Sequence, residues 1–246
     1  MSPQEVTIRA LHNVSEMAIC VSLEQAVWGG SDLDTVPDTI FVVAAKTGGQ
    51  VIAAFDGDLP VGFVLAFPAL RQGRAYLHSH MLAVLPQYQD HGVGRKLKLA
   101  QREDALARGI DLIEWTFDPL QLKNAHFNIA RLGAIARRYI PDAYGRTSSP
   151  LHSGLPTDRL VAEWWLQSPR VEGRLCGPTS NPDTDGEQIA LPASIQDVCR
   201  SDPQGAEQMQ FEFRRAFESY IERGYAAVGF KLNQDQGLYL MEPYED

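Results

Sequence analysis

Residues 81–95 read MLAVLPQYQDHGVGR: an apolar run, a proline, and two glycines one residue apart. The apolar run is typical of a strand, and the residues from Gly92 onward carry the spacing of an amphipathic helix. A glycine turn between a strand and a helix lets the backbone approach a ligand closely, because glycine has no Cβ. The helix start adds free N–H groups and a partial positive charge. The turn is therefore either an anion site or a feature of chain geometry alone, and both interpretations stay open at this point.

The residues on either side of this turn predict a mixed α/β chain. Strands are expected at residues 6–9, 51–55, 61–67, 76–84, 111–117, 159–166 and 188–191, with a terminal hairpin around 233–237. Helices are expected from Asn13 toward Trp28 and at residues 37–47, 92–108, 124–139 and 205–222. Residues 167–188 are rich in Pro, Gly, Ser, Asn and Asp, which predicts a loop.

The composition narrows the class of protein. The 246 residues are 44% hydrophobic and 22% charged, as in globular proteins with a substantial core. The net charge of −9 argues against a protein that binds nucleic acid by neutralising phosphates. The three cysteines are widely spaced and predict neither a disulfide framework nor a zinc site: Cys20, Cys176 and Cys199. The N-terminus has no apolar signal segment and no run is long enough to span a bilayer, so we expect a cytoplasmic protein without membrane contact.

Known phosphate-binding motifs can be compared with the turn. The dinucleotide pattern G-x-G-x-x-G fails because its third glycine is missing, and the Walker pattern is absent. Residues 89–94, QDHGVG, match Q/R-x-x-G-x-G/A, and in this they resemble the coenzyme A pyrophosphate loop of the GNAT acyltransferases. Asn124 and the LGA of residues 132–134 resemble the second motif of that family. The resemblance covers roughly residues 5–166 and is most specific over residues 80–109.

The resemblance implies an α/β (α+β) fold of the GNAT type, with a mixed, mostly antiparallel sheet flanked by helices and a C-terminal α/β extension. We expect an acyltransferase domain over residues 1–166, a loop or linker over 167–187, and an extension over 188–246 that packs on the core or on a second subunit. A homodimer stays open on this interpretation. The segment WTFDPL at residues 115–120 also resembles an uncharacterised bacterial branch of the superfamily.

The same resemblance implies that acetyl-CoA or another acyl-CoA is the co-substrate and that no metal takes part. The fourth and fifth strands of such a fold splay apart to admit the pantetheine arm, whose amides would pair with backbone groups of Leu82, Ala83 and Val84. Arg95 could add positive charge beside the phosphates, and Asn124 is assigned to the same site by its motif. The pyrophosphate would be held by the backbone of Gln89, Asp90, His91, Gly92, Val93 and Gly94.

Two histidines precede the apolar run. His78 and His80 are two residues apart, so strand periodicity puts both on one face, with Leu77, Ser79 and Met81 on the other. Acyl transfer to an amine needs a proton acceptor, and histidine suits that task near neutral pH. The stretch H-x-H-x-L-A-V resembles the strand of arylalkylamine N-acetyltransferases whose two histidines assist amine deprotonation through water. We expect His80 to be the base, followed by His78; a solvated pair, or a metal pair without a third ligand, is the alternative.

One position departs from the family pattern. Many members carry a tyrosine four residues before the glycine of the second motif, where this chain has Ile129. Tyr139 and Tyr144 follow that segment and are the candidate acids for the leaving thiolate, although a thiolate can leave without one. Packing or a substrate contact is their alternative role. The remaining candidates for substrate contacts, each with an ordinary structural role as its alternative, are Glu114, Asp118 and Arg159.

These observations predict an acyl-CoA-dependent N-acyltransferase that moves an acyl group, acetyl by default, directly to a small-molecule primary amine. The absence of cysteine from the motif region agrees with direct transfer. Alternatives that stay open are a non-catalytic coenzyme A sensor, transfer of a succinyl or longer group to an amino acid, and an α/β protein with a purely structural glycine turn. The sequence does not identify the amine.

Overall fold

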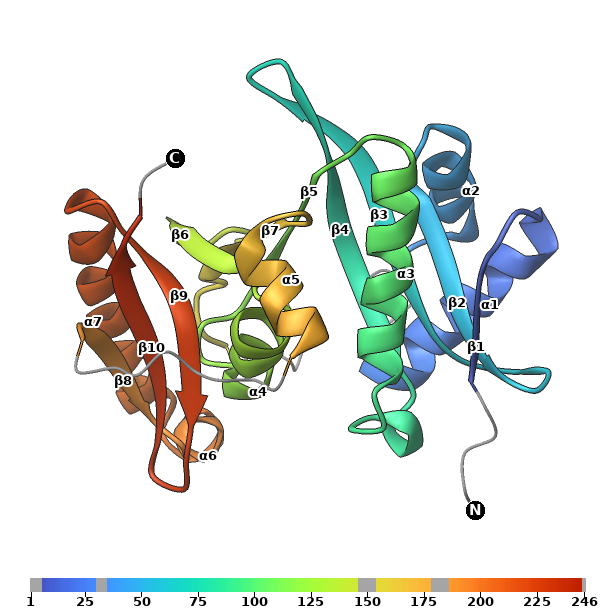
Figure 1. Ribbon diagram of the computed structural model, residues 1–246. Coiled ribbons are helices and arrows are strands. Elements are labelled where there is room, and N and C mark those ends of the chain that lie inside the picture. The colour runs from blue at the N-terminus through green and yellow to red at the C-terminus, as the bar shows by residue number, and fades with distance from the viewer. Residues whose placement is uncertain (1–5, 30–34, 146–153, 178–185, 245–246) are drawn as a thin grey trace. The chain divides into compact units, whose positions relative to one another are not determined.

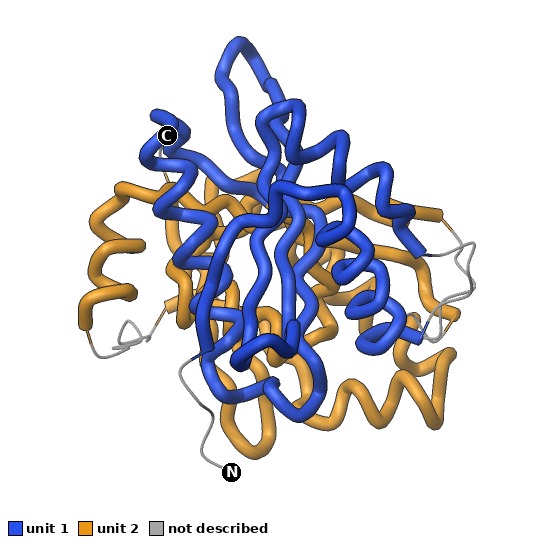
Figure 2. The backbone as a smooth tube through the Cα atoms, turned by 90° about the vertical axis from the view of Figure 1, so that its right-hand side faces the viewer, with its two compact units in different colours: residues 1–114 blue, residues 115–246 orange. Residues whose placement is uncertain are grey.

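The computed structural model describes residues 6–29, 35–145, 154–177 and 186–244. The chain forms two compact units, Met1–Glu114 and Trp115–Asp246, which Figure 2 shows in different colours. Part of the predicted loop over residues 167–188, namely residues 178–185, lies outside the described residues.

The first unit contains a sheet with the strand order β1-β2-β3-β4-β5 (Figure 1). The neighbours from β1 to β4 pair antiparallel, whereas β4 and β5 are parallel. The last residues of β5 already belong to the second unit. The strands are β1 (Thr7–Ala10), β2 (Gln50–Asp56), β3 (Leu59–Arg71), β4 (Arg74–Val84) and β5 (Leu112–Phe117).

Helices cover both faces of this sheet, because alternate residues of β2 belong to two different cores. Val51 packs in the core that α1 and α2 build with Phe41, and Ile52 packs in the core that α3 builds with Leu97. The helix α1 begins with the predicted capping box, in which Glu16 accepts a hydrogen bond from the backbone N–H of Asn13. The helical segments are α1 (Val14–Trp28), α2 (Asp38–Lys46), the 3-10 turn η1 (Pro86–Tyr88) and α3 (Val93–Ala107).

The second unit contains strands in the order β7-β6-β9-β10-β8, all paired antiparallel where the pairing is described. The strands are β6 (Ile135–Ile140), β7 (Arg159–Trp165), β8 (Gln188–Pro192), β9 (Tyr225–Leu232) and β10 (Gln236–Pro243). The helical segments are α4 (Leu122–Ala125), the π-helical turn η2 (His126–Arg131), α5 (Pro169–Cys176), α6 (Ile195–Ser201) and α7 (Pro203–Glu222).

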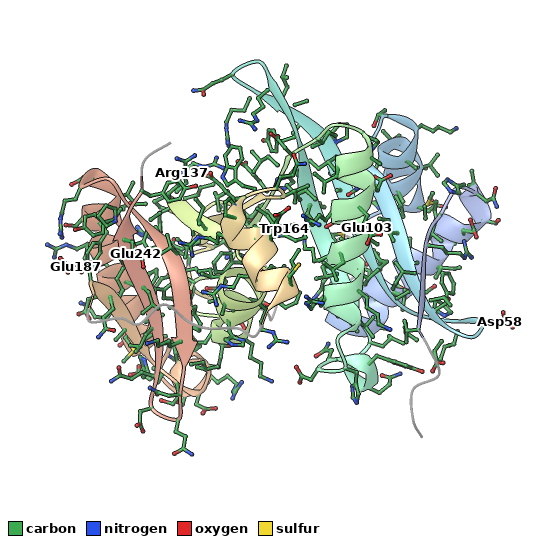
Figure 3. The ribbon with its side chains drawn as sticks, viewed as in Figure 1. Asp58, Glu103, Arg137, Trp164, Glu187 and Glu242 are labelled. Carbon is green, nitrogen blue, oxygen red and sulfur yellow. The ribbon has the colours of Figure 1, made fainter. Side chains whose placement is uncertain are left out.

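Aromatic side chains form much of the core of the second unit. The ring of Tyr239 lies 5.0 Å from that of Phe213 on α7 and 4.8 Å from that of Phe230 on β9, measured between centroids. Trp164, labelled in Figure 3, is fully buried, and its Nε1 donates a hydrogen bond of 2.8 Å to the carbonyl of Leu132. The buried polar atom of Trp164 therefore has a hydrogen-bond partner inside this core.

The predicted fold class is confirmed: helices flank sheets whose strands are mostly antiparallel. The strands expected before residue 118 and the three helices between them are present with small changes in length. Helix α7 and the terminal hairpin of β9 and β10 are also present.

The prediction of one helix over residues 124–139 is wrong. The helical backbone of α4 and η2 ends at Arg131, and Gly133 adopts a φ of +79°, a left-handed conformation that stops a helix. Beyond it the chain is the strand β6, which pairs with β7. The apolar residues of this segment had been assigned to one helical period, although the glycine divides them into two elements.

The prediction of a loop over residues 167–188 is also wrong in its first part, where α5 lies. Ser168 is its N-cap, accepting a hydrogen bond from the backbone N–H of Val171, and Pro169 occupies the first turn. The serine and proline that suggested a loop therefore start a helix. The short helix α6 was likewise not predicted.

Among the described residues, no helix is both long and apolar enough to cross a membrane. The described residues also contain no group of three or more His, Cys, Asp and Glu side chains placed to hold a metal ion.

Candidate active site

The two histidines of β4 lie side by side. Their ring centroids are 6.1 Å apart, and the ring of His80 lies 5.5 Å from that of Phe67 on the neighbouring strand β3. His78 is half-buried, whereas His80 is exposed. The two imidazoles therefore occupy one face of the sheet, on the same side as Phe67, which packs against the core of α1 and α2.

A β-bulge in β4 centres on His80. Leu65 of β3 pairs with Met81, but the next residue, Ala66, pairs with Ser79, so His80 has no partner in the ladder. The extra residue reverses the alternation of side chains at this point. Ser79 bonds to residues of α3, whereas Met81 packs against the core of α1 and α2 on the opposite face. The expectation that Ser79 and Met81 share a face is therefore wrong, because strand periodicity does not hold across a bulge.

Burial shifts the proton affinity of both histidines in the same direction. The pKa of His78 is lowered, first by burial and then by His80 and Lys98, while Glu114 acts against the shift. The pKa of His80 is also lowered by burial. Water reaches part of the His80 side chain, so its burial is less complete than that of His78. Both rings are thus held in the neutral form, which is the form that can accept a proton.

Glu114 does not serve as a free carboxylate. Its side chain is only 4% exposed and accepts two hydrogen bonds from the guanidinium of Arg71, one of them 2.8 Å long, so the pair is bidentate. Glu114 was a candidate for a substrate contact; in the structure its buried carboxylate pairs with the partly exposed Arg71 and ties the β3–β4 hairpin to β5.

The glycine turn leads from β4 into α3. Gln89 follows the 3-10 turn, and its side-chain Nε2 donates a hydrogen bond of 2.9 Å to the carbonyl of Val84. The Nδ1 of His91 lies 2.7 Å from the carbonyl oxygen of Gln89. Asp90 and Gly92 adopt φ values of 62° and 81°, in the left-handed region. Side chains of Gln89 and His91 thus hold the turn together from within, while the turn itself is exposed.

Gly92 is the N-cap of α3, and no side chain caps this helix within the described chain. The first backbone bond of the helix runs from Lys96 N–H to the carbonyl of Gly92, so the N–H groups of Val93 and Gly94 precede the intrahelical ladder. A Cβ built on Gly92 would meet no atom within 4 Å, so the glycine is present for its backbone angle rather than for space. This helix start presents backbone donors to an anion.

The strand that leads to this turn has one incompletely paired edge. On one side Leu82, Ala83 and Val84 pair with β3. On the other side the described pairing of β4 with β5 covers only two positions, Leu77 with Ile113 and His78 with Glu114. The backbone of Leu82–Val84 is therefore not taken up by β5 in the pairing described, as the predicted contact with an amide-bearing ligand requires.

The other predicted site residues lie in the second unit. Tyr139 donates a hydrogen bond of 2.5 Å to Asp158, and burial, followed by this carboxylate, raises its pKa. A tyrosine hydroxyl so engaged holds its proton tightly. Tyr144 is exposed, and its hydroxyl lies 2.7 Å from Thr116 Oγ1. Ile129 is fully buried in the core, so no side chain there reaches solvent.

Asp118 and Arg159 are close in the same unit. Burial raises the pKa of Asp118, the backbone N–H of Leu120 and the charge of Arg159 lower it, and Asp158 raises it. Asp118 Oδ1 accepts the Leu120 N–H at 2.8 Å, as an aspartate in a turn does. The guanidinium of Arg159 lies 5.3 Å from the ring centre of Tyr144. Asn124 is exposed on α4.

Residues 19–133 match the model of the acetyltransferase (GNAT) family. Over these residues the chain is a GNAT acetyltransferase domain. Solved structures of this fold include a GNAT-family protein from Desulfovibrio desulfuricans, with 15% identity, a TM-score of 0.52, and coverage of 65% of this chain and 99% of that chain. The ribosomal-protein-S18-alanine N-acetyltransferase from Escherichia coli has 15% identity, a TM-score of 0.52, and coverage of 66% and 95%. The protein yncA from Salmonella typhimurium, solved with acetyl-CoA, has 16% identity, a TM-score of 0.54, and coverage of 67% and 96%.

No curated protein matched the chain. At these low sequence identities, the likeness to the solved GNAT structures shows the fold alone. The GNAT family match makes this chain an N-acetyltransferase enzyme, and it leaves the type of acceptor undetermined.

The geometry fits the coenzyme of the GNAT family. The uncapped start of α3 and the exposed turn before it offer backbone N–H groups to a pyrophosphate, and Arg95 lies in the first turn of the same helix. The incompletely paired edge of β4 offers amide partners to an extended pantetheine. These features lie on one continuous segment, residues 80–95, in the order that the bound molecule would need.

The sequence interpretation did not identify a buried polar cluster next to the histidines. Lys98 and Gln101 are buried on α3 and bond to Ser79 beneath the bulge. Glu103, labelled in Figure 3, is exposed on the same helix. The signal that could have revealed the cluster was the position of Lys98 and Gln101 on the apolar stripe of α3, between Leu97 and Ala105, where a polar side chain needs a partner.

Proposed function

We propose that this GNAT enzyme transfers an acetyl group from acetyl-CoA directly to a small-molecule primary amine, with His80 as the general base and His78 as its neighbour in the proton path. The observation that carries the proposal is the pairing of two histidines, whose pKa values are lowered by burial, at the bulge of the strand that runs into the glycine turn. Acyl transfer to an amine uses a base that takes up a proton, and the strand places this base next to a turn whose backbone N–H groups can bind the coenzyme.

The proposed cofactor contacts follow the segment in order. Backbone groups of Leu82, Ala83 and Val84 pair with the amides of the pantetheine, and the coenzyme supplies an activated acyl thioester when bound. Arg95 adds charge, and Asn124 contributes from α4. The pyrophosphate is held by the backbone of the turn, Gln89, Asp90, His91, Gly92, Val93 and Gly94.

The residues of the chain move one proton in this scheme. His80 accepts it from the ammonium of the acceptor, directly or through a water molecule, and His78 shares the charge that then forms on the pair. Backbone N–H groups near the bulge stabilise the oxyanion of the tetrahedral intermediate. The neutral amine forms the new C–N bond at the thioester carbon. As the C–S bond breaks, the leaving thiolate takes the second proton from the nitrogen, and no tyrosine acid takes part, since the position of Ile129 is buried and Tyr139 is bound to Asp158.

Two of the three cysteines, Cys20 and Cys199, support direct transfer rather than an acyl-cysteine intermediate, whereas Cys176 is exposed at the end of α5. Burial, followed by the charge of Glu24, raises the pKa of Cys20 to about 12. Burial also raises the pKa of Cys199. Both thiols are buried and protonated near neutral pH, which makes them poor nucleophiles.

On the acceptor side we propose Asp118 and Arg159 as substrate contacts, and Tyr144 as a wall of the same region. Asp118 could receive an ammonium group and Arg159 a carboxylate. We further propose that residues 188–246 form an extension that shapes this acceptor region. A carboxylate on the acceptor would favour an amino-acid-like amine.

The test is release of coenzyme A thiol from acetyl-CoA and from succinyl-CoA against a panel of primary amines that includes amino acids and peptides. We expect acetyl-CoA with a small amine to give turnover, and His80→Ala to lower kcat about a hundredfold while coenzyme A binding stays within about twofold. His12→Ala, an exposed histidine before α1, is the matched control. Full turnover in His80→Ala, or turnover with peptides only, would contradict the proposal.

A further inference from the structure

A buried lysine lies beneath the bulge. Lys98 on α3 is 2% exposed, and its Nζ donates hydrogen bonds of 2.8 Å to Ser79 Oγ and 3.0 Å to Gln101 Oε1. Ser79 Oγ in turn donates to Gln101 Oε1 over 3.2 Å. Ser79 and Gln101 are also buried, so the three side chains form a buried polar cluster on the face of the sheet opposite the histidines.

Ser79 lies on this face because of the bulge. His80, the next residue in sequence, is unpaired. The backbone of Ser79 pairs with Ala66, the neighbour of the Leu65 that pairs with Met81. If the strand were regular, Ser79 would share a face with Met81, which packs against the core of α1 and α2. The hydrogen bond from Lys98 therefore fixes the residue that borders the bulge and excludes the regular register.

The cluster is anchored at its far end as well. Gln50 of β2 donates hydrogen bonds of 2.9 Å to the carbonyl of Gln101 and 2.6 Å to Asp104, so α3 is fixed to two strands of the sheet. A lysine on the apolar stripe of a helix is costly, since burial disfavours its charged form. Leucine or methionine would fill the same space without that cost. The free-energy cost of burying Lys98 indicates that this residue has a role beyond packing.

We propose that Lys98 is a positioning residue for the base: through its hydrogen bond to Ser79 it holds the bulge, and the bulge holds His80 and His78 in place for proton transfer. This inference rests on the function proposed above. Burial lowers the pKa of Lys98 to about 7, and Lys98 is itself one of the causes that lower the pKa of His78. The cluster and the histidines are thus coupled through the strand as well as through charge.

Ser79 offers a matched pair of variants. Threonine and valine have nearly the same size and shape, so Ser79→Thr and Ser79→Val fill the site alike. Only the threonine keeps the hydroxyl to which Lys98 donates. We expect Ser79→Val and Lys98→Met to lower kcat about tenfold or more, because small displacements of a base cost rate steeply, with the Kd of coenzyme A within about twofold. Ser79→Thr should recover most of the rate. Lys96→Met, an exposed lysine on the same helix, should leave kcat and KM unchanged.

Two outcomes would overturn the inference. One is equal kcat in Ser79→Val and Ser79→Thr. The other is a loss confined to the affinity for coenzyme A, which would assign the cluster to packing beneath the turn. If Lys98→Met does not fold, as judged by circular dichroism, the Ser79 pair still decides.

A second readout separates this inference from the proposed function. NMR of the imidazole nitrogens reports the environment of His78 and His80 without any turnover. Ser79→Val should shift both sets of signals, and Ser79→Thr should not; unchanged signals in Ser79→Val would contradict the positioning role. If these shifts appear while His80→Ala keeps full kcat, the proposed base is wrong and the positioning of the rings by Lys98 stands.

Discussion

The side-chain amide of Gln89 donates a hydrogen bond of 2.9 Å to the backbone carbonyl of Val84, the last residue of β4. This bond closes the turn onto the end of its own strand, so the start of α3 is held at a fixed distance from the strand edge. In the proposed cofactor site, the side chain of Gln89 thus acts on the shape of the turn, and its backbone is the part that faces the pyrophosphate.

Gln89→Leu should therefore weaken the binding of coenzyme A about tenfold, because it removes the bond while keeping the volume of the side chain. Isothermal titration with coenzyme A measures the Kd. Gln87→Leu is the control, since Gln87 is exposed in the same turn and has no hydrogen bond described to the strand. Equal affinity in the two variants would show that the bond to Val84 does not support the turn.

Gly92→Ala should lose both stability and coenzyme binding. The φ of Gly92 is +81°, and an alanine there costs about 1 kcal/mol because its Cβ disfavours the left-handed region. Gly57 in the β2–β3 turn has a φ of +59° and equally open space around an added Cβ. Gly57→Ala should lose a similar free energy of unfolding in urea and leave the Kd of coenzyme A unchanged. If both variants bind alike, the turn is structural only.

The pH dependence of kcat/KM should show the lowered pKa values of the two histidines. A base works when it is neutral, and a lowered pKa keeps it neutral down to a lower pH. The midpoint of the acid limb of the profile should therefore lie below pH 6.5, the ordinary pKa of histidine. The charged and titratable groups that act on the pKa of His78 are His80 on the same face, Glu114, and Lys98 on the opposite face of the sheet. His12→Ala should leave the limb in place and His80→Ala should remove or displace it. A limb at or above 6.5 would contradict the assignment.

Lys98 should make the stability of the protein depend on pH between about 7 and 10.5. Its pKa is about 7 in the fold and 10.5 in the unfolded chain, so the unfolded state holds the proton over this range and stability rises with pH. The free energy of unfolding should increase by about 2 kcal/mol more in the native protein than in Lys98→Met between about pH 7 and 9. Parallel urea titrations of both proteins measure this difference, and equal slopes would show that Lys98 keeps an ordinary pKa.

Tyr139→Phe should lower stability and leave the chemistry intact. The hydroxyl donates to the buried carboxylate of Asp158, which also pairs with Arg214, and a hydrogen bond to a charged group contributes about 2 kcal/mol. We expect that loss in urea unfolding, with kcat within about twofold of the native value. A large fall in kcat without loss of stability would restore Tyr139 as the acid.

Much of the first unit could be predicted from sequence because its signals are local. The apolar run before Pro86, the Gly92 turn and the spacing of Val93, Leu97 and Ala105 each determine an element within a few residues. The helix that was expected across Gly133 failed because the residues on both sides are apolar, and only the glycine separates η2 from β6.

The features of the candidate site that are local in sequence could also be predicted, and those that depend on contacts between distant residues could not. The order of histidines, strand and turn is written along one segment and could be predicted. The bulge could not, since it depends on how β4 pairs with β3, and pairing is not local. The bonds of Glu114 to Arg71 and of Tyr139 to Asp158 join residues distant in sequence, so their candidate roles could be judged only from the fold.

The bulge has a consequence for a chain one residue shorter. With His80 deleted, Ser79 would still pair with Ala66 and Met81 with Leu65, and the two side chains would still point to opposite faces, now by simple alternation. The sheet would lose an irregularity and the ring contacts of His80 with Phe67 and His78, while the pairs of its ladder would remain. The pairing of β4 with β3 therefore does not depend on His80.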